Sequence, residues 1–173
     1  CFVMNTPDFE AAKFWVGSLG KTCTHAIVYA QLYTADAVCH GLNAFLVPIR
    51  DVNTMLTFPG VIVGDLGEKI GLNGVDNGFL MFDNYRICKE NLLSKIGDVT
   101  DDGNYVTLIQ DKNKRLATLL GPLSIGRVYI SMQVSSYLAK AVTIAIRYSA
   151  VRKQFGPVQD NSSSSIVELP VLE

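Results

Sequence analysis

LATLLGPLSIGRVYISMQVSSYLAKAVTIAIRYSAV, residues 116–151, is the stretch of sequence that decides the fold. Apolar side chains recur along it in steps of three, four or seven residues from Leu116 to Val151, which is the spacing of one face of an α-helix. At 1.5 Å per residue such a helix is roughly 55 Å long, so we expect it to pack in a bundle or across a subunit interface. The pair Gly121-Pro122 is expected to break it, because proline lacks a backbone donor and clashes with the preceding turn.

A different pattern fills the sequence before this stretch, up to residue 103. Eleven of the fourteen glycines lie there, between short runs rich in β-branched and aromatic residues that have strand length. The runs are residues 26–33, 42–49, 60–63 and 78–87. They predict a compact antiparallel β domain, either a barrel or a sandwich. The predicted class is therefore α+β, with a β domain at residues 1–103, a helical segment at 104–157 and a flexible loop or tail at 158–173.

The composition excludes several functional classes. The chain has 173 residues, of which 49% are apolar and 18% charged, and its net charge of −1 gives no field to attract nucleic acid or an acidic membrane. Apolar runs are broken well before the roughly 20 residues that a membrane span needs. We therefore expect a soluble protein. Because the chain opens at Cys1 without an initiator methionine or a signal segment, we also expect it to be a piece of something longer.

The cysteines and histidines give no pattern of a metal site or of a disulfide scaffold. Four cysteines, with no C-x-x-C pair, stand beside only two histidines, so we expect idle or buried free thiols and no bound metal. His40 follows Cys39, but neighbours in a strand point to opposite faces, so a lone loop histidine is expected there. The other cysteines are Cys1, Cys23 and Cys88.

The first candidate site is the segment at residues 14–22, FWVGSLGKT, which holds the only tryptophan of the chain. A glycine such as Gly17 lets the backbone come close to a planar ligand, and the Trp15 indole could stack on such a ligand. Exposed N–H groups could bond to ring carbonyls or phosphate oxygens. The alternative is a bulged β-turn with Trp15 in the core. The segment lacks the spacing of a phosphate-binding P-loop, and no G-x-G-x-x-G of dinucleotide-binding proteins occurs in the chain.

A second candidate site closes the helical stretch, at residues 147–157, RYSAVRKQFGP. Arg152 precedes Gln154 and Phe155, and a guanidinium is suited to bind a pyrophosphate through two parallel hydrogen bonds. The alternative is that the cations of this segment only complement the negative end of the helix dipole.

A third candidate is Arg127, a charge among apolar helix residues that needs a partner. A structural salt bridge and a buried anionic or carbonyl ligand are the two interpretations. The acidic residues of the β half have no spacing typical of a general acid and base pair. We expect them to be solvated charges at turns and edges, and we assign no catalytic residue within the chain. They are Asp65, Glu68, Asp76 and Asp83.

Eight short segments follow one another in a characteristic order. They are NTPDFEAAK (5–13), W-x-G-x-LGKT-x-THA (15–26), CHGL (39–42), PIRD (48–51), PGV (59–61), VGD (63–65), DNGF (76–79) and AIRYSA-x-R-x-QFG (145–156). In this order they resemble the peroxisomal acyl-CoA oxidases of the acyl-CoA dehydrogenase superfamily, and the resemblance extends over nearly the whole chain up to Pro157. Val16 and the Gln-Phe-Gly ending are more similar to the branched-chain, pristanoyl-type oxidases.

The resemblance implies an FAD-dependent enzyme that desaturates acyl-CoA to trans-2-enoyl-CoA in peroxisomal fatty-acid β-oxidation and reduces O2 to H2O2. It implies that this chain is the middle β domain followed by the first long helix of a C-terminal helical bundle. Arg127 would help to bind the thioester portion of the acyl-CoA substrate.

The resemblance also implies cofactor contacts. Trp15 and Gly17 would lie by the isoalloxazine ring of FAD, where the Gly17 N–H could bond to the ring and polarise it toward hydride acceptance. Arg152, with Gln154 and Phe155 beside it, would reach the FAD diphosphate of the neighbouring subunit, which implies a homodimer with shared cofactor sites.

The sequence departs from the family pattern in one important respect. The catalytic glutamate of the family lies far beyond the Arg-x-Gln-Phe-Gly segment, whereas Glu168 and Glu173 follow Arg152 by only 16 and 21 residues, so neither is assigned as the base. We expect the chain alone to be inactive and to hold FAD weakly or not at all. Two other functions stay open: an acyl-CoA dehydrogenase that uses a protein electron acceptor, and a non-catalytic oxidase-like protein that binds acyl-CoA.

Overall fold

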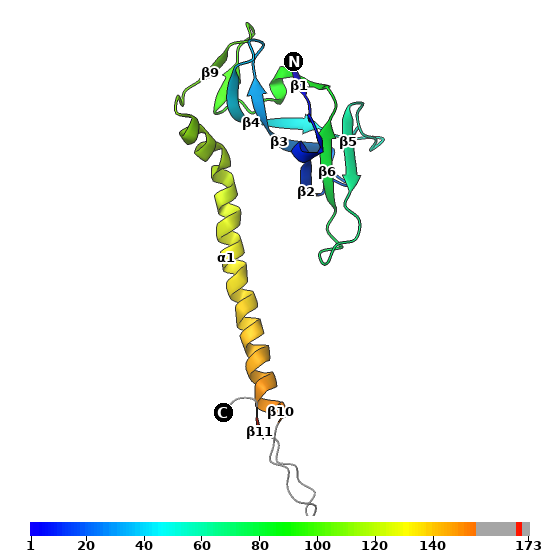
Figure 1. Ribbon diagram of the computed structural model, residues 1–173, viewed down its shortest axis with the longest axis vertical. Coiled ribbons are helices and arrows are strands. Elements are labelled where there is room, and N and C mark those ends of the chain that lie inside the picture. Colours follow the sequence, from blue (N-terminus) through cyan, green and yellow to red (C-terminus); the bar gives the residue numbers. More distant parts are fainter. Residues whose placement is uncertain (155–168, 171–173) are drawn as a thin grey trace, which may run out of the picture. The chain divides into compact units, whose positions relative to one another are not determined.

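The computed structural model describes residues 1–154 and 169–170 (Figure 1). The chain divides into two compact units, residues 1–119 and residues 120–173. The first unit holds nine strands, two 3-10 turns and the beginning of a long helix. The described residues of the second unit hold the rest of that helix and one short strand pair.

The strands of the first unit alternate with turns rich in glycine, asparagine and aspartate. They are β1 (Phe2–Met4), β2 (Lys13–Gly17), β3 (His25–Tyr33), β4 (Cys39–Pro48), β5 (Val61–Asp65), β6 (Asn77–Phe82), β7 (Tyr85–Ile87), β8 (Gly97–Val99) and β9 (Tyr105–Thr107). The 3-10 turns are η1 (Phe9–Ala11) and η2 (Lys89–Asn91).

The longest strands, β3 and β4, form an antiparallel hairpin (Figure 1). Its register runs from His25 opposite Pro48 to Tyr33 opposite Cys39, with an irregularity just after Gln31. The connecting turn is closed by a hydrogen bond from the Thr34 N–H to the Val38 carbonyl, at 3.2 Å. Apolar residues alternate along β3, which places one of its faces against the core.

The other strands form small antiparallel sheets. β6 is the central strand of a three-stranded sheet in the order β2-β6-β5, while β1 pairs with β7 and β8 with β9. No closed barrel is formed among the described residues, so the predicted barrel is not confirmed, whereas the mixed strand and helix class is. One apolar core lies between the sheets of the first unit; its buried members include Leu19, Val47, Ile49, Leu80 and Phe82.

The predicted strands correspond to observed ones, with one difference. The run predicted at residues 78–87 is two strands, β6 and β7, because the chain turns at Asp83 and Asn84, where Asn84 adopts a φ of 49°. Asparagine tolerates this left-handed conformation better than most residues. Strands β1, β2, β8 and β9 were not predicted.

The long helix α1 spans Lys112–Val151 and continues through Pro122. The prediction that Gly121-Pro122 would break the helix is therefore wrong. A proline inside a helix costs about 3 kcal/mol, since one backbone hydrogen bond is lost and the ring displaces the preceding turn. The alanine and leucine residues around it are among the strongest helix formers, and the helix propagates past this single defect.

The chain after α1 is described only in part. Strand β10 (Lys153–Gln154) pairs antiparallel with β11 (Leu169–Pro170). The tail predicted at residues 158–173 therefore lies almost entirely outside the described residues. Among the described residues, no helix combines the length and the hydropathy that are needed to cross a membrane.

Candidate functional site

The end of β2 and the turn that follows it, residues 15–22, are the centre of the first candidate site, and we name this segment the Trp15 loop. The register between β2 and β6 shifts between Lys13 and Val16, which makes an irregularity of the β-bulge type in β2. Trp15 and Ser18 adopt φ angles of 65° and 62°, which are unfavourable for residues with a Cβ. Trp15 is 54% exposed. A bulged β-turn was one of the two interpretations of this sequence, and the bulge is observed. The same interpretation placed Trp15 in the core, and that part is wrong because the side chain is exposed.

The backbone of the Trp15 loop is open at Gly17. A Cβ built on this residue would meet no atom within 4 Å. Next to it, the half-exposed ring of Phe14 stacks on Phe79 of β6 with 6.4 Å between ring centroids. The loop therefore presents an exposed indole and an accessible stretch of backbone side by side, which is the surface that a flat ring can approach.

Asp76 and Asn77, just before and at the start of β6, hold the Trp15 loop from one side. Asp76 Oδ2 accepts hydrogen bonds from the backbone N–H groups of Lys21 and Thr22, both at 3.0 Å, and from the Thr22 hydroxyl at 2.9 Å. The Asp76 carbonyl accepts the Ser18 N–H at 2.5 Å. Asn77, which is 6% exposed, donates from Nδ2 to the Trp15 carbonyl at 3.4 Å.

Arg50 holds the same loop through its carbonyl groups. The side chain is 5% exposed. Its guanidinium donates to the carbonyls of Leu19, Gly20 and Cys23 at 3.0, 2.7 and 2.9 Å. Within the described part of the chain Arg50 forms no ion pair. Three peptide carbonyls thus solvate a buried cation, which is the condition for burying a charge without a carboxylate partner.

Two glycines let the Trp15 loop approach β6 closely. A Cβ on Gly78 would lie 2.5 Å from the backbone nitrogen of Gly20 and 2.7 Å from its Cα. A Cβ on Gly20 would lie 2.5 Å from Asp76 Oδ1. Side chains at either position would force the loop away from β6, so both positions require glycine.

The environment shifts the ionisation of the acidic groups around this loop. Burial raises the pKa of Asp76, but the N–H and hydroxyl donors of Lys21 and Thr22 outweigh it, so the pKa is lowered overall. The Gly67 N–H lowers the pKa of Asp65, which also pairs with Lys21 at 3.3 Å. The expectation that Asp76 is a solvated turn charge is therefore wrong, because its carboxylate organises the loop. Glu68 and Asp83 are exposed, as predicted.

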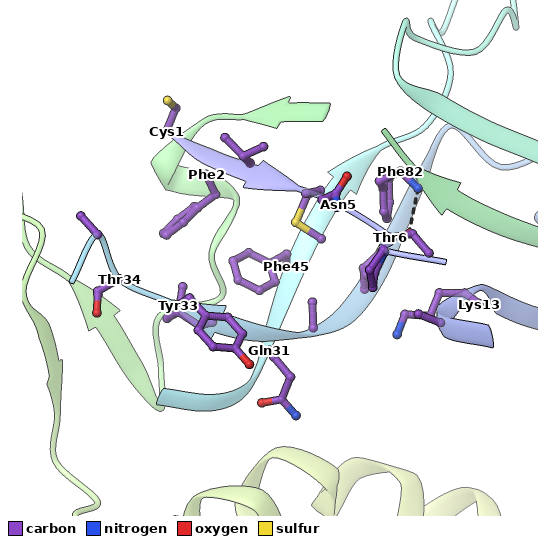
Figure 2. Close-up of a pocket in the computed structure, with 18 residues that line it drawn as sticks. Cys1, Phe2, Asn5, Thr6, Lys13, Gln31, Tyr33, Thr34, Phe45 and Phe82 are labelled. Carbon is purple, nitrogen blue, oxygen red and sulfur yellow. Dashed lines mark hydrogen bonds between the residues drawn. The ribbon is translucent and has the colours of Figure 1, made fainter. Parts of the chain in front are cut away.

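A cavity of about 760 Å³ opens elsewhere in the first unit, between β1, β3 and β4 (Figure 2). Phe2 and Phe45 give it an apolar wall, while Gln31 and Thr6 add polar groups. The Phe82 N–H donates to the Thr6 hydroxyl at 2.9 Å at one side of it. None of the described residues predicted as site residues lines this cavity.

The remaining predicted site residues lie in the second unit. Arg127 is exposed on α1 and forms no ion pair within the described part of the chain, so the predicted structural salt bridge is not found there. Arg152 is exposed directly after α1, and its N–H donates to the Tyr148 carbonyl at 2.8 Å. Gln154 lies in β10 by its backbone, and Phe155 lies outside the described residues.

His40 is not a loop residue, contrary to the prediction. It lies in β4, half buried, and its ring stacks on Tyr105 with 4.4 Å between ring centroids. Its Nε2 lies 2.8 Å from the Thr34 hydroxyl. All four cysteines are free, as expected.

Sequence reasoning missed the two groups that hold the Trp15 loop. Arg50 lies within the motif PIRD and Asp76 within the motif DNGF. The sequence therefore pointed to these two segments, but it did not indicate which residue of each segment has a role. Their contacts reach residues about 30 and 55 positions away in the chain, which no local pattern records.

Comparisons with known proteins agree on one family. Residues 120–173 match the model of the acyl-CoA oxidase C-alpha1 domain. The chain is 51% identical to human peroxisomal acyl-coenzyme A oxidase 3 over 172 residues, which are 99% of this chain and 24% of that protein. It thus spans about a quarter of the length of this relative.

Two solved structures show the same likeness. Acyl-CoA oxidase 1 of Arabidopsis thaliana is 40% identical with a TM-score of 0.79, over 98% of this chain and 25% of that one. Acyl-CoA oxidase-1 of Caenorhabditis elegans, solved in complex with FAD and ATP, is 38% identical with a TM-score of 0.73, over 99% of this chain and 23% of that one.

Proposed function

The chain belongs to the acyl-CoA oxidase family, and on this premise we propose that it is a segment of a peroxisomal, FAD-dependent acyl-CoA oxidase. The reaction of the parent protein is the desaturation of acyl-CoA to trans-2-enoyl-CoA in fatty-acid β-oxidation, with O2 reduced to H2O2. FAD, when bound, supplies the hydride acceptor for this reaction. Identity is higher to human acyl-coenzyme A oxidase 3, at 51%, than to the human type 1 enzyme, at 46%. We propose the branched-chain type from Val16 and the Gln-Phe-Gly ending of the sequence.

The observation that carries this proposal is the exposed surface of the Trp15 loop. Trp15 combines an exposed indole with an unfavourable backbone φ. Such a backbone angle persists only where the surrounding structure or a function requires it. Beside it, Gly17 leaves the backbone accessible. These features fit a planar ring, so Trp15 and Gly17 are the residues that would hold the flavin ring, the indole by packing and the Gly17 N–H by a hydrogen bond.

The second group of residues would bind the charged part of the cofactor. Arg152 is exposed, and a guanidinium can donate two parallel hydrogen bonds to a diphosphate. We propose that Arg152, with Gln154 and Phe155, reaches the FAD diphosphate of a second subunit in a homodimer. Arg127 is exposed on α1 and is proposed to bind the thioester portion of acyl-CoA.

No residue of this chain is proposed as the catalytic base. Glu168 and Glu173 are too close to Arg152 to match the family glutamate, so the chain alone is expected to show no turnover and little or no FAD binding. The activity belongs to the longer protein, and the experiment must use it.

The test is peroxide formation by the parent protein in air, with acyl-CoA and no other electron acceptor. We expect a flavin absorption spectrum and H2O2 formation, both weakened by Trp15→Ala. Phe9→Ala, which removes an exposed aromatic ring outside the loop, is the matched control and should leave both unchanged. Enoyl-CoA limited to about one equivalent per flavin, with no peroxide and with turnover only after an artificial electron acceptor is added, would indicate a dehydrogenase. Binding of acyl-CoA without any product would indicate a non-catalytic protein. Either result would overturn the proposal.

A further inference from the structure

Two charged side chains bind the backbone of the Trp15 loop and of Cys23, and they form no ion pair with each other. The Arg50 guanidinium binds the carbonyls of residues 19, 20 and 23. The Asp76 carboxylate binds the N–H groups of residues 21 and 22. The cation therefore binds three peptide carbonyls of residues 19–23 and the anion binds two peptide N–H groups of the same stretch, so these five groups are oriented by charges of the complementary sign.

This pair of charges fixes a conformation that the loop does not favour by itself. Trp15 and Ser18 have positive φ angles, and such angles persist in residues with a Cβ only when the surrounding structure imposes them. The Ser18 N–H donates to the backbone carbonyl of Asp76, and the Trp15 carbonyl accepts from Asn77. The Asp76 carboxylate reaches Ser18 through Thr22, whose hydroxyl contacts both the carboxylate and the Ser18 carbonyl. We therefore expect loss of the charge to loosen the residues that hold these backbone angles.

The residues that the charges orient contribute little to the core. Of the Trp15 loop, only Leu19 is fully buried, whereas Trp15 and Gly17 are exposed. A buried arginine and a half-buried aspartate that were needed for packing alone would not have to bind the backbone of an exposed loop. Their effect is on the surface that the loop presents.

We propose that Asp76 and Arg50 are positioning residues, which set the orientation of the Trp15 indole and of the Gly17 backbone for a planar ring ligand. The identity of that ligand as a flavin rests on the proposed function above. The orientation itself is a property of this chain and can be measured without cofactor.

Nuclear magnetic resonance of the 173-residue chain gives the direct test, because the single tryptophan produces one indole Nε1–H signal. Asp76→Asn and Arg50→Lys keep the size or the charge of the side chain but disturb its hydrogen bonds. We expect both variants to shift the Trp15 indole signal and the Gly17 amide signal. Asp83→Asn and Arg86→Lys, the same changes at exposed positions, are the matched controls and should leave both signals in place.

The result that overturns the proposal is equally specific. If the Lys21 and Thr22 amide signals move in Asp76→Asn while the Trp15 and Gly17 signals do not, Asp76 only stabilises its own turn. Should Asp76→Asn fail to fold, Arg50→Lys and an acid titration of the unmodified chain decide the question. Because the pKa of Asp76 is lowered, its carboxylate takes up a proton only at a pH below the ordinary carboxyl pKa of about 3.9. We expect the Trp15 indole signal to shift over the same pH range as the Lys21 and Thr22 amide signals. If the indole signal shifts over a different pH range, the proposal is contradicted.

A second measurement separates this proposal from the function. In the parent holoprotein, Asp76→Asn should shift the visible flavin bands, whereas Asp83→Asn should not. If the parent protein binds no flavin, the proposed function fails, but the resonance experiment still supports or overturns the positioning role.

Discussion

Asp76 Oδ2 accepts hydrogen bonds from both the backbone N–H and the side-chain hydroxyl of Thr22, at 3.0 and 2.9 Å, across 54 residues of sequence. The single proton of this hydroxyl is shared with the Ser18 carbonyl, whose oxygen lies 3.1 Å from the hydroxyl oxygen. One threonine therefore joins the middle and the end of the Trp15 loop to the segment before β6.

Replacing Thr22 by valine removes the hydroxyl but keeps the shape of the side chain. We expect a loss of about 1.5 kcal/mol in the free energy of unfolding, measured with urea, which is the lower end of the range of about 1.5–3 kcal/mol for one hydrogen bond to a charged group. The bond from the Thr22 backbone N–H to Asp76 remains. Thr143→Val is the control, because its hydroxyl bonds only to the Ala139 carbonyl of its own helix. Equal effects of the two substitutions would show that the contact with Asp76 adds nothing.

Gly78 and Gly17 should respond differently to the same substitution. Gly78→Ala places a methyl group 2.5 Å from the Gly20 nitrogen and 2.8 Å from the Gly64 carbonyl oxygen, which are backbone atoms that cannot move aside. We expect it to lower the free energy of unfolding by about 3 kcal/mol. Gly17→Ala meets open space and should change the stability by less than about 0.5 kcal/mol while weakening FAD binding by the parent protein. A destabilised Gly17→Ala would contradict this description of the loop.

Arg50→Met tests the buried cation. The substitution keeps an apolar stem but leaves the carbonyls of Leu19, Gly20 and Cys23 without their donors. An unsatisfied buried group costs about 1–3 kcal/mol, so we expect a loss of more than about 2 kcal/mol in the free energy of unfolding. Arg86→Met, at an exposed position, should lose less than about 0.5 kcal/mol. Similar losses for both would mean that Arg50 acts only through its packing.

The stability of the first unit should fall on the acid side. The Thr34 hydroxyl lowers the pKa of Asp36, the Thr54 and Asn53 N–H groups lower that of Asp51, and the Gly67 N–H lowers that of Asp65. A carboxyl whose pKa is lower in the folded state stabilises the fold above its unfolded pKa of about 3.9. That stability is lost as the pH falls through the folded pKa.

The urea midpoint should therefore be the same at pH 7 and pH 5 and decrease toward pH 3. Asp51→Asn should show a smaller decrease than the unmodified chain, since one of the titrating groups is gone. A midpoint at pH 3 equal to that at pH 7 would contradict the prediction.

The strands and the helix could be predicted where the pattern was strong. β3 and β4 are long and place alternate apolar residues in the core, so their sequence carries the period of a strand. All five residues of β2 are exposed, so it has no such alternation and was missed. Pro122 misled the prediction because proline is a helix breaker only when the surrounding residues do not favour the helix strongly enough.

The candidate site could be predicted in part. The composition of the Trp15 loop, with one tryptophan among glycines, left two interpretations open, a ligand surface and a bulged β-turn, and the bulge is observed. The roles of Arg50 and Asp76 depend on which peptide groups approach them in the folded chain, and that information is not local. Arg127 looked as though it would need a partner because its neighbours in sequence are apolar, yet on α1 it is exposed.

The lengths of chain between these contacts also bear on the order of assembly. The β3–β4 hairpin closes through the five residues from Thr34 to Val38, so we expect it to form early, as local hairpins do. The bonds from Asp76 and Asn77 to residues 15–22 close loops of more than 50 residues, and such distant pairings are slow to form. We therefore expect the Trp15 loop to form last during folding and to open first under mild denaturation. Hydrogen exchange at Lys21 and Thr22 should be faster than in the hairpin.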